Sequence, residues 1–221
     1  MAEQGRTRTR LLAAAGELFA ARGFRGTTIR DVATRARANV AAAHYHFGSK
    51  EALYLGVLRA QFADIRGRLA ARGAAPSRAE LARLDDAEVA ARLRARVYTM
   101  LELLLGPPPG VHGTLMHREM VDPSEALPVI ADEFIAPVTQ ELHDMVARLA
   151  PGLDAAAVER CADSIVAQAL FYRFTMPILL RRWRRPAFTR RQIGALADHI
   201  TAFSLAGLSA ARPRRGGRRA R

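Results

Sequence analysis

Six histidines and one cysteine are the residues of this chain best suited to metal binding or proton transfer. The histidines are His44, His46, His112, His117, His143 and His199. No two of them have the HxxxH or HExxH spacing that brings two imidazoles to one helix face, and Cys161 has no second cysteine beside it. The sequence therefore predicts no metal site and no cofactor. Cys161 falls in an apolar helical pattern, which favours a small core residue over a redox sensor.

The tripeptide His117-Arg118-Glu119 is the nearest approach to an acid–base cluster. Adjacent residues on a helix point in different directions, so these three side chains cannot converge on one substrate atom. A polar helix face is the simpler interpretation. The chain also lacks a glycine-rich phosphate loop, a nucleophile elbow and a carboxylate pair, which disfavours an enzyme.

A different chemistry, the recognition of phosphates and base edges, is indicated between residues 27 and 50. Arg30 carries a planar guanidinium fork suited to guanine O6 and N7, although a solvated or phosphate-bound arginine is an equal alternative. Val40, Ala41 and Ala42 can read only DNA shape or thymine methyl groups. His44 can reach a base edge or a phosphate.

Short helices must position these side chains. Thr28 is a suitable N-cap for a first helix, with an apolar face at positions 29, 32 and 33, and Asn39 is a suitable N-cap for a second over residues 40–47. The small residues at the front of the second helix leave a slim cylinder, which fits a DNA major groove about 12 Å wide. Thr28 and Asn39, at the helix starts, belong to the expected interface.

A third helix begins after Ser49, the predicted N-cap, and carries Lys50 in its first turn. Backbone amides of a first helical turn favour anions, so Lys50 is a candidate phosphate contact. Helix, turn and helix form the minimal unit that places one helix in a groove while its partner braces against the backbone.

The chain resembles the DNA-binding domain of the TetR family of bacterial transcriptional regulators on the motifs TTIRDVA at 27–33 and YHFGSKE at 45–51. The resemblance implies a base contact at Arg30 and phosphate contacts at Tyr45 and Lys50. The family's turn carries Gly-Val where this chain has Arg37-Ala38. A different turn, or a left-handed arginine under strain, is therefore expected.

Two further segments resemble one branch of that family, the regulators related to a repressor linked to cefoperazone and chloramphenicol sensitivity. They are NVAA at 39–42, and REM at 118–120 followed by Pro123.

The net charge of +13 is distributed unevenly. Residues 1–58 hold nine basic and four acidic residues, residues 212–221 hold six arginines and no acid, and residues 59–211 hold nineteen and seventeen. A basic head on a nearly neutral body is typical of a protein that binds a polyanion. Lys50 is the one lysine, so the arginine bias itself is better explained by a GC-rich genome.

Helical periodicity extends along the whole chain, and no alternating strand pattern competes with it. The sequence predicts an all-α fold with a helix-turn-helix head at 1–58, a helical body at 59–211 and a disordered basic tail at 212–221, for which a nonspecific DNA contact is the alternative. Residues 1–9 are expected to be a solvated start or a DNA-contacting arm. The predicted helices span residues 9–22, 50–72, 78–84, 86–105, 113–121, 124–149 with a kink at Pro137, 154–180 and 189–208.

The family resemblance implies that the last two helices pair with a second copy and that the preceding helices enclose an effector pocket. Tyr98, Met116, Met120 and Phe134 are candidate pocket residues, with ordinary core packing as the alternative. The proline loop 107–109 and Pro137 are the expected places of adjustment. The chain has no N-terminal secretion segment and no 18-residue apolar run, so it is expected to be cytoplasmic and away from membranes.

These observations predict a homodimeric, sequence-specific repressor that leaves a palindromic operator when a small-molecule effector binds. A nonspecific DNA-binding protein of nucleoid type is one alternative. A helical small-molecule enzyme is the other.

Overall fold

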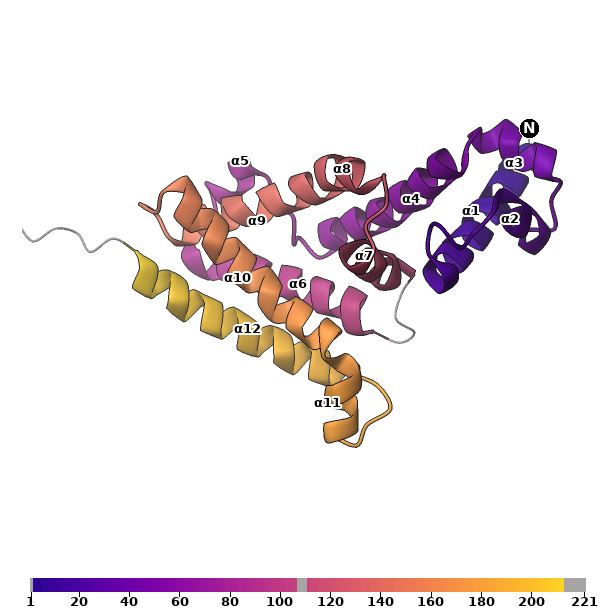
Figure 1. The fold of residues 1–221 in the computed structure, drawn as a ribbon. Helices are drawn as coiled ribbons and strands as arrows, with labels where there is room; N and C mark the ends of the chain where they lie inside the picture. The colour runs from indigo at the N-terminus through magenta and orange to yellow at the C-terminus, as the bar shows by residue number, and fades with distance from the viewer. Residues whose placement is uncertain (1, 107–110, 213–221) are drawn as a thin grey trace, which may run out of the picture. The chain divides into compact units, whose positions relative to one another are not determined.

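A computed structural model describes residues 2–106 and 111–212 of the chain (Figure 1). Within these ranges every regular element is helical, so the predicted all-α class is confirmed. The prediction for the proline loop, residues 107–109, and for all of the basic tail except Arg212 lies outside the described residues.

The chain divides into two compact units. The N-terminal unit comprises residues 1–67 and 108–136, and the C-terminal unit comprises residues 68–107 and 137–221. The chain therefore passes between them near Gly67, Pro107 and Pro137. Pro137, one of the places where adjustment was predicted, lies at one of these boundaries, and the adjustment itself stays a prediction. The functional boundary at residue 58 stays a prediction, because compactness does not define a DNA-binding domain.

The N-terminal unit is built around the first four helices. They are α1 (Ala2–Arg22), α2 (Ile29–Arg35), α3 (Val40–Phe47) and α4 (Lys50–Ala71). The large buried side chains of these four helices come from α1, α2 and α4 and include Leu11, Phe19, Val32, Leu53, Tyr54 and Leu58. The helix predicted from residue 9 begins earlier, at Ala2, and residues 3–6 are exposed, as expected of a solvated start; a DNA contact by this segment stays a prediction. Glu3 lies in its first turn, where the helix dipole favours a carboxylate.

The second part of the N-terminal unit follows the undescribed segment. It contains α7 (Val111–Val121), α8 (Leu127–Val129) and a π-helix, η1 (Ile130–Ile135). The helix predicted over 124–149 begins later, at Leu127, and its helical backbone continues through α8 and η1 into α9 (Ala136–Leu149). Pro137 has no N–H to donate to the preceding turn, and the backbone widens into the π-turn directly before it.

The C-terminal unit holds the larger core. Its helices are α5 (Arg78–Leu81), α6 (Asp86–Leu105), most of α9, α10 (Ala155–Phe174), α11 (Met176–Arg182) and α12 (Arg190–Ala211). α6 packs against both α10 and α12. The fully buried side chains of this core include Leu93, Val97, Leu101, Met145, Ile165 and Ile193. Cys161 is half-buried against it, in agreement with a packing role.

The helix predicted over 154–180 is also wrong, because α10 ends at Phe174 and α11 starts at Met176. Thr175, between them, has φ −93° and ψ 3°. Pro177 explains the break, since it has no N–H to donate to the carbonyl four residues earlier, in the last turn of α10. It stands in the first turn of α11, where its missing N–H costs nothing.

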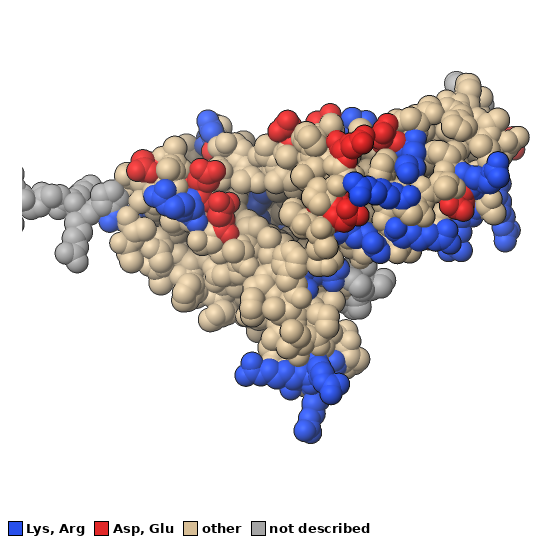
Figure 2. Space-filling view, in the orientation of Figure 1, with Lys and Arg blue, Asp and Glu red and all other residues tan. Residues whose placement is uncertain are grey.

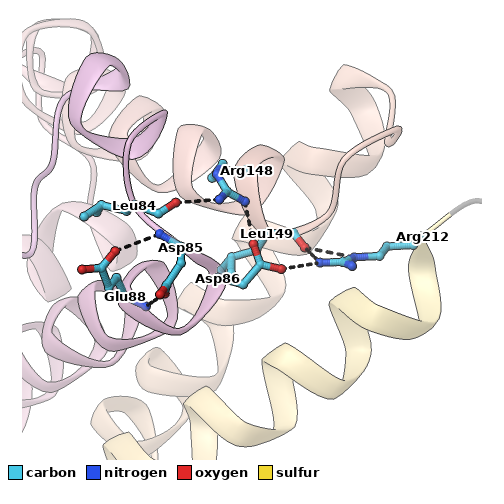
Figure 3. A network of polar contacts seen from close by, with 7 residues as sticks. All are labelled: Leu84, Asp85, Asp86, Glu88, Arg148, Leu149 and Arg212. Atoms are coloured by element: carbon cyan, nitrogen blue, oxygen red, sulfur yellow. Dashed lines mark hydrogen bonds and ion pairs between the residues drawn. The ribbon is translucent and has the colours of Figure 1, made fainter.

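One end of the C-terminal unit is closed by the polar network in Figure 3. Arg148 donates to the carboxylate of Asp86 at 2.6 Å and to the carbonyl of Leu84 at 2.6 Å. Arg212, just after α12, donates to the carbonyl of Leu149 at 3.1 Å and lies 3.5 Å from Asp86. The hydrogen bond from Arg148 is the main reason that the pKa of Asp86 is lowered. The network joins the start of α6 to the ends of α9 and α12.

By length and composition alone, α12 could cross a membrane. One face of this helix packs on α6, with Ile193, Ala197 and Ile200 buried. Its apolar character thus has an explanation within the core of the unit.

Candidate nucleic-acid interface

Helix α3 has one inward and one outward face. Ala43 is fully buried, and Val40 and Ala42 are half-buried. Ala41, His44 and Tyr45 lie at i, i+3 and i+4 and are exposed, Tyr45 at 76%. This outward face is slim at the start of the helix and broad at its end, as the sequence predicted. Val40 and Ala42 stand at its margins rather than on it.

Side-chain caps fix the start of both short helices. The Asn39 carboxamide oxygen accepts the N–H of Ala41 at 2.9 Å. The Thr28 hydroxyl accepts the N–H of Asp31 at 3.1 Å and donates to the Asp31 carboxylate at 2.7 Å. That hydrogen bond, and the backbone one from Thr28, lower the pKa of Asp31. Thr28 and Asn39 therefore act first by positioning α2 and α3.

The turn between α2 and α3 contains a left-handed arginine, the second of the two alternatives expected from the missing glycine. Arg37 has φ +50°, in the left-handed region that ordinarily favours glycine. The N–H of Ala38 reaches the carbonyl of Ala33 at 2.9 Å, which closes the end of α2. The arginine keeps the tight turn and adds a cation beside the start of α3. Sequence reasoning did not identify Arg37 as a contact residue, although the departure at this position was its signal.

Arg30 and Arg37 are exposed, and within the described residues neither forms an ion pair. Their neighbours differ, because Arg35 binds Glu17 of α1 at 2.6 Å and Arg22 lies 3.9 Å from Asp31. The paired arginines hold α2 against α1, whereas Arg30 and Arg37 keep their donors available for an external anion.

Lys50 and His44 have partners within the unit. The Lys50 ammonium lies 4.3 Å from the centroid of the Phe24 ring, a cation–π contact that places the half-buried lysine beside the α1–α2 connection. The His44 Nδ1 lies 3.0 Å from the carbonyl oxygen of Gly48. A phosphate bound by Lys50 would contact an ammonium group that also makes the cation–π contact with Phe24.

Helix α7 contributes a brace that the sequence interpretation missed. The Arg118 guanidinium donates to the carbonyls of Ala20 at 2.8 Å and Ala21 at 2.6 Å. These carbonyls belong to the last turn of α1, whose oxygens have no partner within the helix. Arg118 therefore caps the first helix of the head from a segment nearly a hundred residues away. Sequence reasoning interpreted it as part of a polar helix face.

The neighbouring Glu119 makes a second link. It is only 3% exposed, and its carboxylate accepts the Tyr54 hydroxyl of α4 at 2.6 Å. The backbone N–H and hydroxyl of Ser124 each donate to the same carboxylate at 3.1 Å. Burial first, and then this carboxylate, raise the pKa of Tyr54. Glu119 thus joins α4 to the α7–α8 connection through neutral donors.

A cavity of about 350 Å³ lies beside this link. Its walls come from α1, the α1–α2 connection, α4 and α7, including Phe19, Phe24, Tyr54 and Glu119. Arg25 and Asp122 in its wall lie 3.6 Å apart. The residues predicted for an effector pocket do not line it.

Those four predicted residues have separate environments. Phe134 is buried and stacks on Phe62 of α4, with ring centroids 4.7 Å apart. Met116 is half-buried and Met120 is 58% exposed. Tyr98 belongs to the C-terminal unit, where the Arg72 guanidinium covers its ring at 5.1 Å. Their assignment to one pocket stays a prediction.

The described ranges contain no group of three or more His, Cys, Asp or Glu side chains that could hold a metal ion. The parts of the candidate interface described above are helix caps, exposed side chains and unpaired cations. A short capped helix with an exposed face, braced by a second and a third helix, is the arrangement of a helix-turn-helix DNA-binding protein.

Sequence comparison agrees with this arrangement. Residues 11–57 match the family described as bacterial regulatory proteins of the tetR family. Residues 89–208 match the C-terminal domain of the HTH-type transcriptional dual regulator CecR. Because that second match covers more than half of the chain, the protein belongs to the TetR family of transcriptional regulators, in the branch with a CecR-type C-terminal domain.

Individual relatives divide into partial and nearly complete matches. The chain is 43% identical over 61 residues to the transcriptional repressor KstR2 of Rhodococcus jostii and 41% identical over 59 residues to the transcriptional repressor NicS of Pseudomonas putida. These matches span 30% and 28% of the two relatives. It is 27% identical to the dual regulator CecR of Shigella flexneri, over 86% of each chain.

Solved structures share the fold. The TetR-family regulator SCO4454 from Streptomyces coelicolor has a TM-score of 0.66 at 18% identity, covering 93% of this chain and 97% of its own. A transcriptional regulator from Pseudomonas aeruginosa PAO1 has a TM-score of 0.68 at 19% identity, covering 93% of each. The hemolysin II regulator HlyIIR has a TM-score of 0.59 at 20% identity, covering 90% and 97%.

Proposed function

We propose that the protein is a homodimeric repressor that binds a palindromic operator through α3 and leaves it when a small-molecule effector binds. The observation that carries this proposal is the outward face of α3, where Ala41, His44 and Tyr45 are exposed, together with the exposed and unpaired Arg30 and Arg37 of the preceding helix and turn. A groove-reading helix needs such a slim start, and it needs flanking cations for the phosphates. The protein acts in the cytoplasm by binding and not by catalysis.

The dimer is supported by an exposed apolar surface on the last helices. Phe171 of α10 and Phe203 of α12 are 55% and 65% exposed, although α10 and α12 otherwise form the core of the C-terminal unit. Large aromatic side chains in water are unfavourable, and together they mark a surface that another protein covers. A second copy of the chain is the expected partner for this surface, because a palindromic operator requires a two-fold symmetric dimer with recognition helices about 34 Å apart.

Control by an effector is proposed to act through the α7 brace. Arg118 and Glu119 bind α1 and α4, the helices that support α2 and α3. A ligand that favours another arrangement of α7 would change the support of the reading helix. Tenfold weaker operator binding requires about 1.4 kcal/mol of coupling between the two sites.

Footprinting on the DNA upstream of the protein's own coding sequence, combined with sedimentation at micromolar concentration, tests this function. The expected results are two protected half-sites and a dimer. A monomer that protects nothing would refute the proposal, and equal affinity for random DNA would favour a nonspecific binder instead, since specific binding exceeds it by about a thousandfold or more.

Effector control is tested by screening hydrophobic metabolites and drugs for thermal stabilisation of the free protein. Each ligand that stabilises the protein is then assayed for release of operator DNA. Ligands that stabilise it strongly and yet leave operator affinity unchanged would contradict a sensory role. The body would then serve dimerisation alone.

A further inference from the structure

The near-neutral charge of the body conceals a strong local imbalance. Residues 164–197 contain seven arginines and no acidic residue, while the rest of 59–211 holds twelve basic and seventeen acidic residues. Six of the seven fall within residues 181–191, at the end of α11 and the start of α12. All six are exposed, and together they define an arginine surface: Arg181, Arg182, Arg184, Arg185, Arg190 and Arg191.

The arginine surface is held on an ordered support. Trp183 packs edge-on against the buried ring of Phe188, with centroids 5.6 Å apart, and so anchors the connection between α11 and α12. The N–H of Arg185 reaches the carbonyl of Leu180 at 3.0 Å, and Arg184 adopts φ +52° to close the end of α11. In Figure 2 this region is a continuous blue group at the lower end of the C-terminal unit, with no red atoms beside it.

None of the six arginines takes part in an ion pair within the described residues. The same unit pairs several of its other arginines, for example Arg94 with Asp198 at 2.5 Å and Arg78 with Asp144 at 2.8 Å. Six neighbouring like charges repel one another, and a polyanion would relieve that repulsion. The surface therefore calls for a partner with several closely spaced anionic groups.

We propose that the arginine surface binds the phosphate backbone of double-stranded DNA, outside the half-site read by α3. Guanidinium groups bind phosphates with two parallel hydrogen bonds, and a duplex presents a negative charge about every 1.7 Å along its axis. The protein is already a DNA-binding regulator, so duplex DNA is a polyanion that it is expected to meet. No further partner has to be assumed.

The short helix that carries the arginine surface favours duplex DNA over an anionic lipid surface as the partner. Interfacial helices carry an extended apolar face, whereas α11 has only seven residues and Trp183 packs one edge against Phe188. Ile178 is exposed at 69%, and the flanking Phe174 and Trp183 are exposed at 48% and 38%, so the exposed apolar side chains here are few. The lipid surface is thus the rival outcome of the test.

The test compares two double variants of the full-length protein. Arg181→Gln/Arg185→Gln removes two charges from the arginine surface, and Arg83→Gln/Arg160→Gln removes two exposed, unpaired arginines elsewhere in the same unit. Binding to a random-sequence duplex is measured as a function of salt. Each lost phosphate contact lowers the slope of log K against log salt by about 0.9, so the first variant should lose about 1.8 and roughly tenfold in affinity.

The control variant should bind as the wild type does, and Arg181→Lys/Arg185→Lys should keep most of the slope because it keeps the charge. Thermal unfolding checks that all variants fold. Equal slopes for the first variant and the control would overturn the proposal. Loss of binding to phosphatidylglycerol vesicles with unchanged DNA binding would overturn it in favour of lipid. Failure of the wild type to protect an operator would refute the proposed function, whereas these slopes concern the arginine surface alone.

Discussion

Among the described residues, most arginines that pack around the helix-turn-helix are paired within the fold, whereas those of the arginine surface are not. In the head, Arg22, Arg25 and Arg35 each lie within ion-pair distance of a carboxylate, and Arg118 donates both of its hydrogen bonds to helix carbonyls. The six arginines around α11 and α12 have no such partner in the described structure. Arginine number alone therefore does not locate a nucleic-acid contact. The informative quantity is the number of cations left unpaired after the fold has used the rest.

The largest expected effect comes from reversing the electrostatics of the reading face. Ala41→Glu places a carboxylate on the exposed side of the first turn of α3, where it is compatible with the helix dipole. Like charges at an interface cost several kcal/mol, so operator affinity should fall by about a hundredfold or more while the melting temperature stays unchanged. Arg182→Glu on the arginine surface should have a smaller effect. The reverse order, in an electrophoretic mobility assay, would break the comparison.

Arg30 and Lys50 are proposed to contact a base and a phosphate respectively, so their variants should separate the two kinds of contact within the head. Arg30→Ala should cost about 1–3 kcal/mol at particular base pairs and relax specificity there. Lys50→Ala should weaken operator and random DNA alike and lower the salt slope by about 0.9 per contact. Binding to a library of operator variants distinguishes the two. A uniform loss on all sites for Arg30→Ala would contradict its assignment as a base contact.

Arg118→Met tests whether an arginine that is hydrogen-bonded within the N-terminal unit stabilises the folded state. It removes two charge-assisted hydrogen bonds to α1, so the free energy of unfolding should fall by about 2 kcal/mol. Arg25→Met is the matched control, because its exposed pair with Asp122 is worth no more than about 1 kcal/mol. Urea unfolding measures both. Equal losses would show that Arg118 is no more structural than a surface arginine.

The smallest effect is expected at the far end of the C-terminal unit. The folded-state pKa of Asp86 is lowered below its ordinary 3.8 by Arg148, so its contribution to stability is present above that value and is lost as the pH falls through the lowered pKa. Asp86→Asn should reduce the melting temperature slightly at about pH 7, and the difference should vanish once the pH falls below the lowered pKa of Asp86. Asp163→Asn, at an exposed carboxylate outside the ion pairs described, should change neither. A difference that persists in acid would contradict this role.

Local signals predicted the head well, because its structure depends on neighbours in the sequence. Thr28 and Asn39 were recognisable as caps, and the absence of glycine at the turn made a left-handed Arg37 one of two expected alternatives. The break at Thr175 was missed because the apolar period continues through it, although Pro177 carried the information. Periodicity records which face is buried and is insensitive to one proline.

The α7 brace could not have been predicted from spacing. Arg118 and Glu119 find their partners in α1 and α4, between 65 and 98 residues earlier in the chain. A polar pair on a helix has the same local pattern whether it faces water or another helix. Likewise, the sequence contains the excess of arginine over acidic residues at 164–197, but a single net charge for residues 59–211 hides it.

The turn at Arg37 has a consequence for how such a regulator can be tuned. A left-handed backbone costs a non-glycine residue roughly 1–2 kcal/mol, so Arg37→Gly would relax the turn while removing a cation beside α3. Arg37→Gly is thus expected to raise the thermal stability and to shorten the residence time on DNA. A designer, or natural variation, can move the protein along that trade-off with a single substitution and leave the reading face itself untouched.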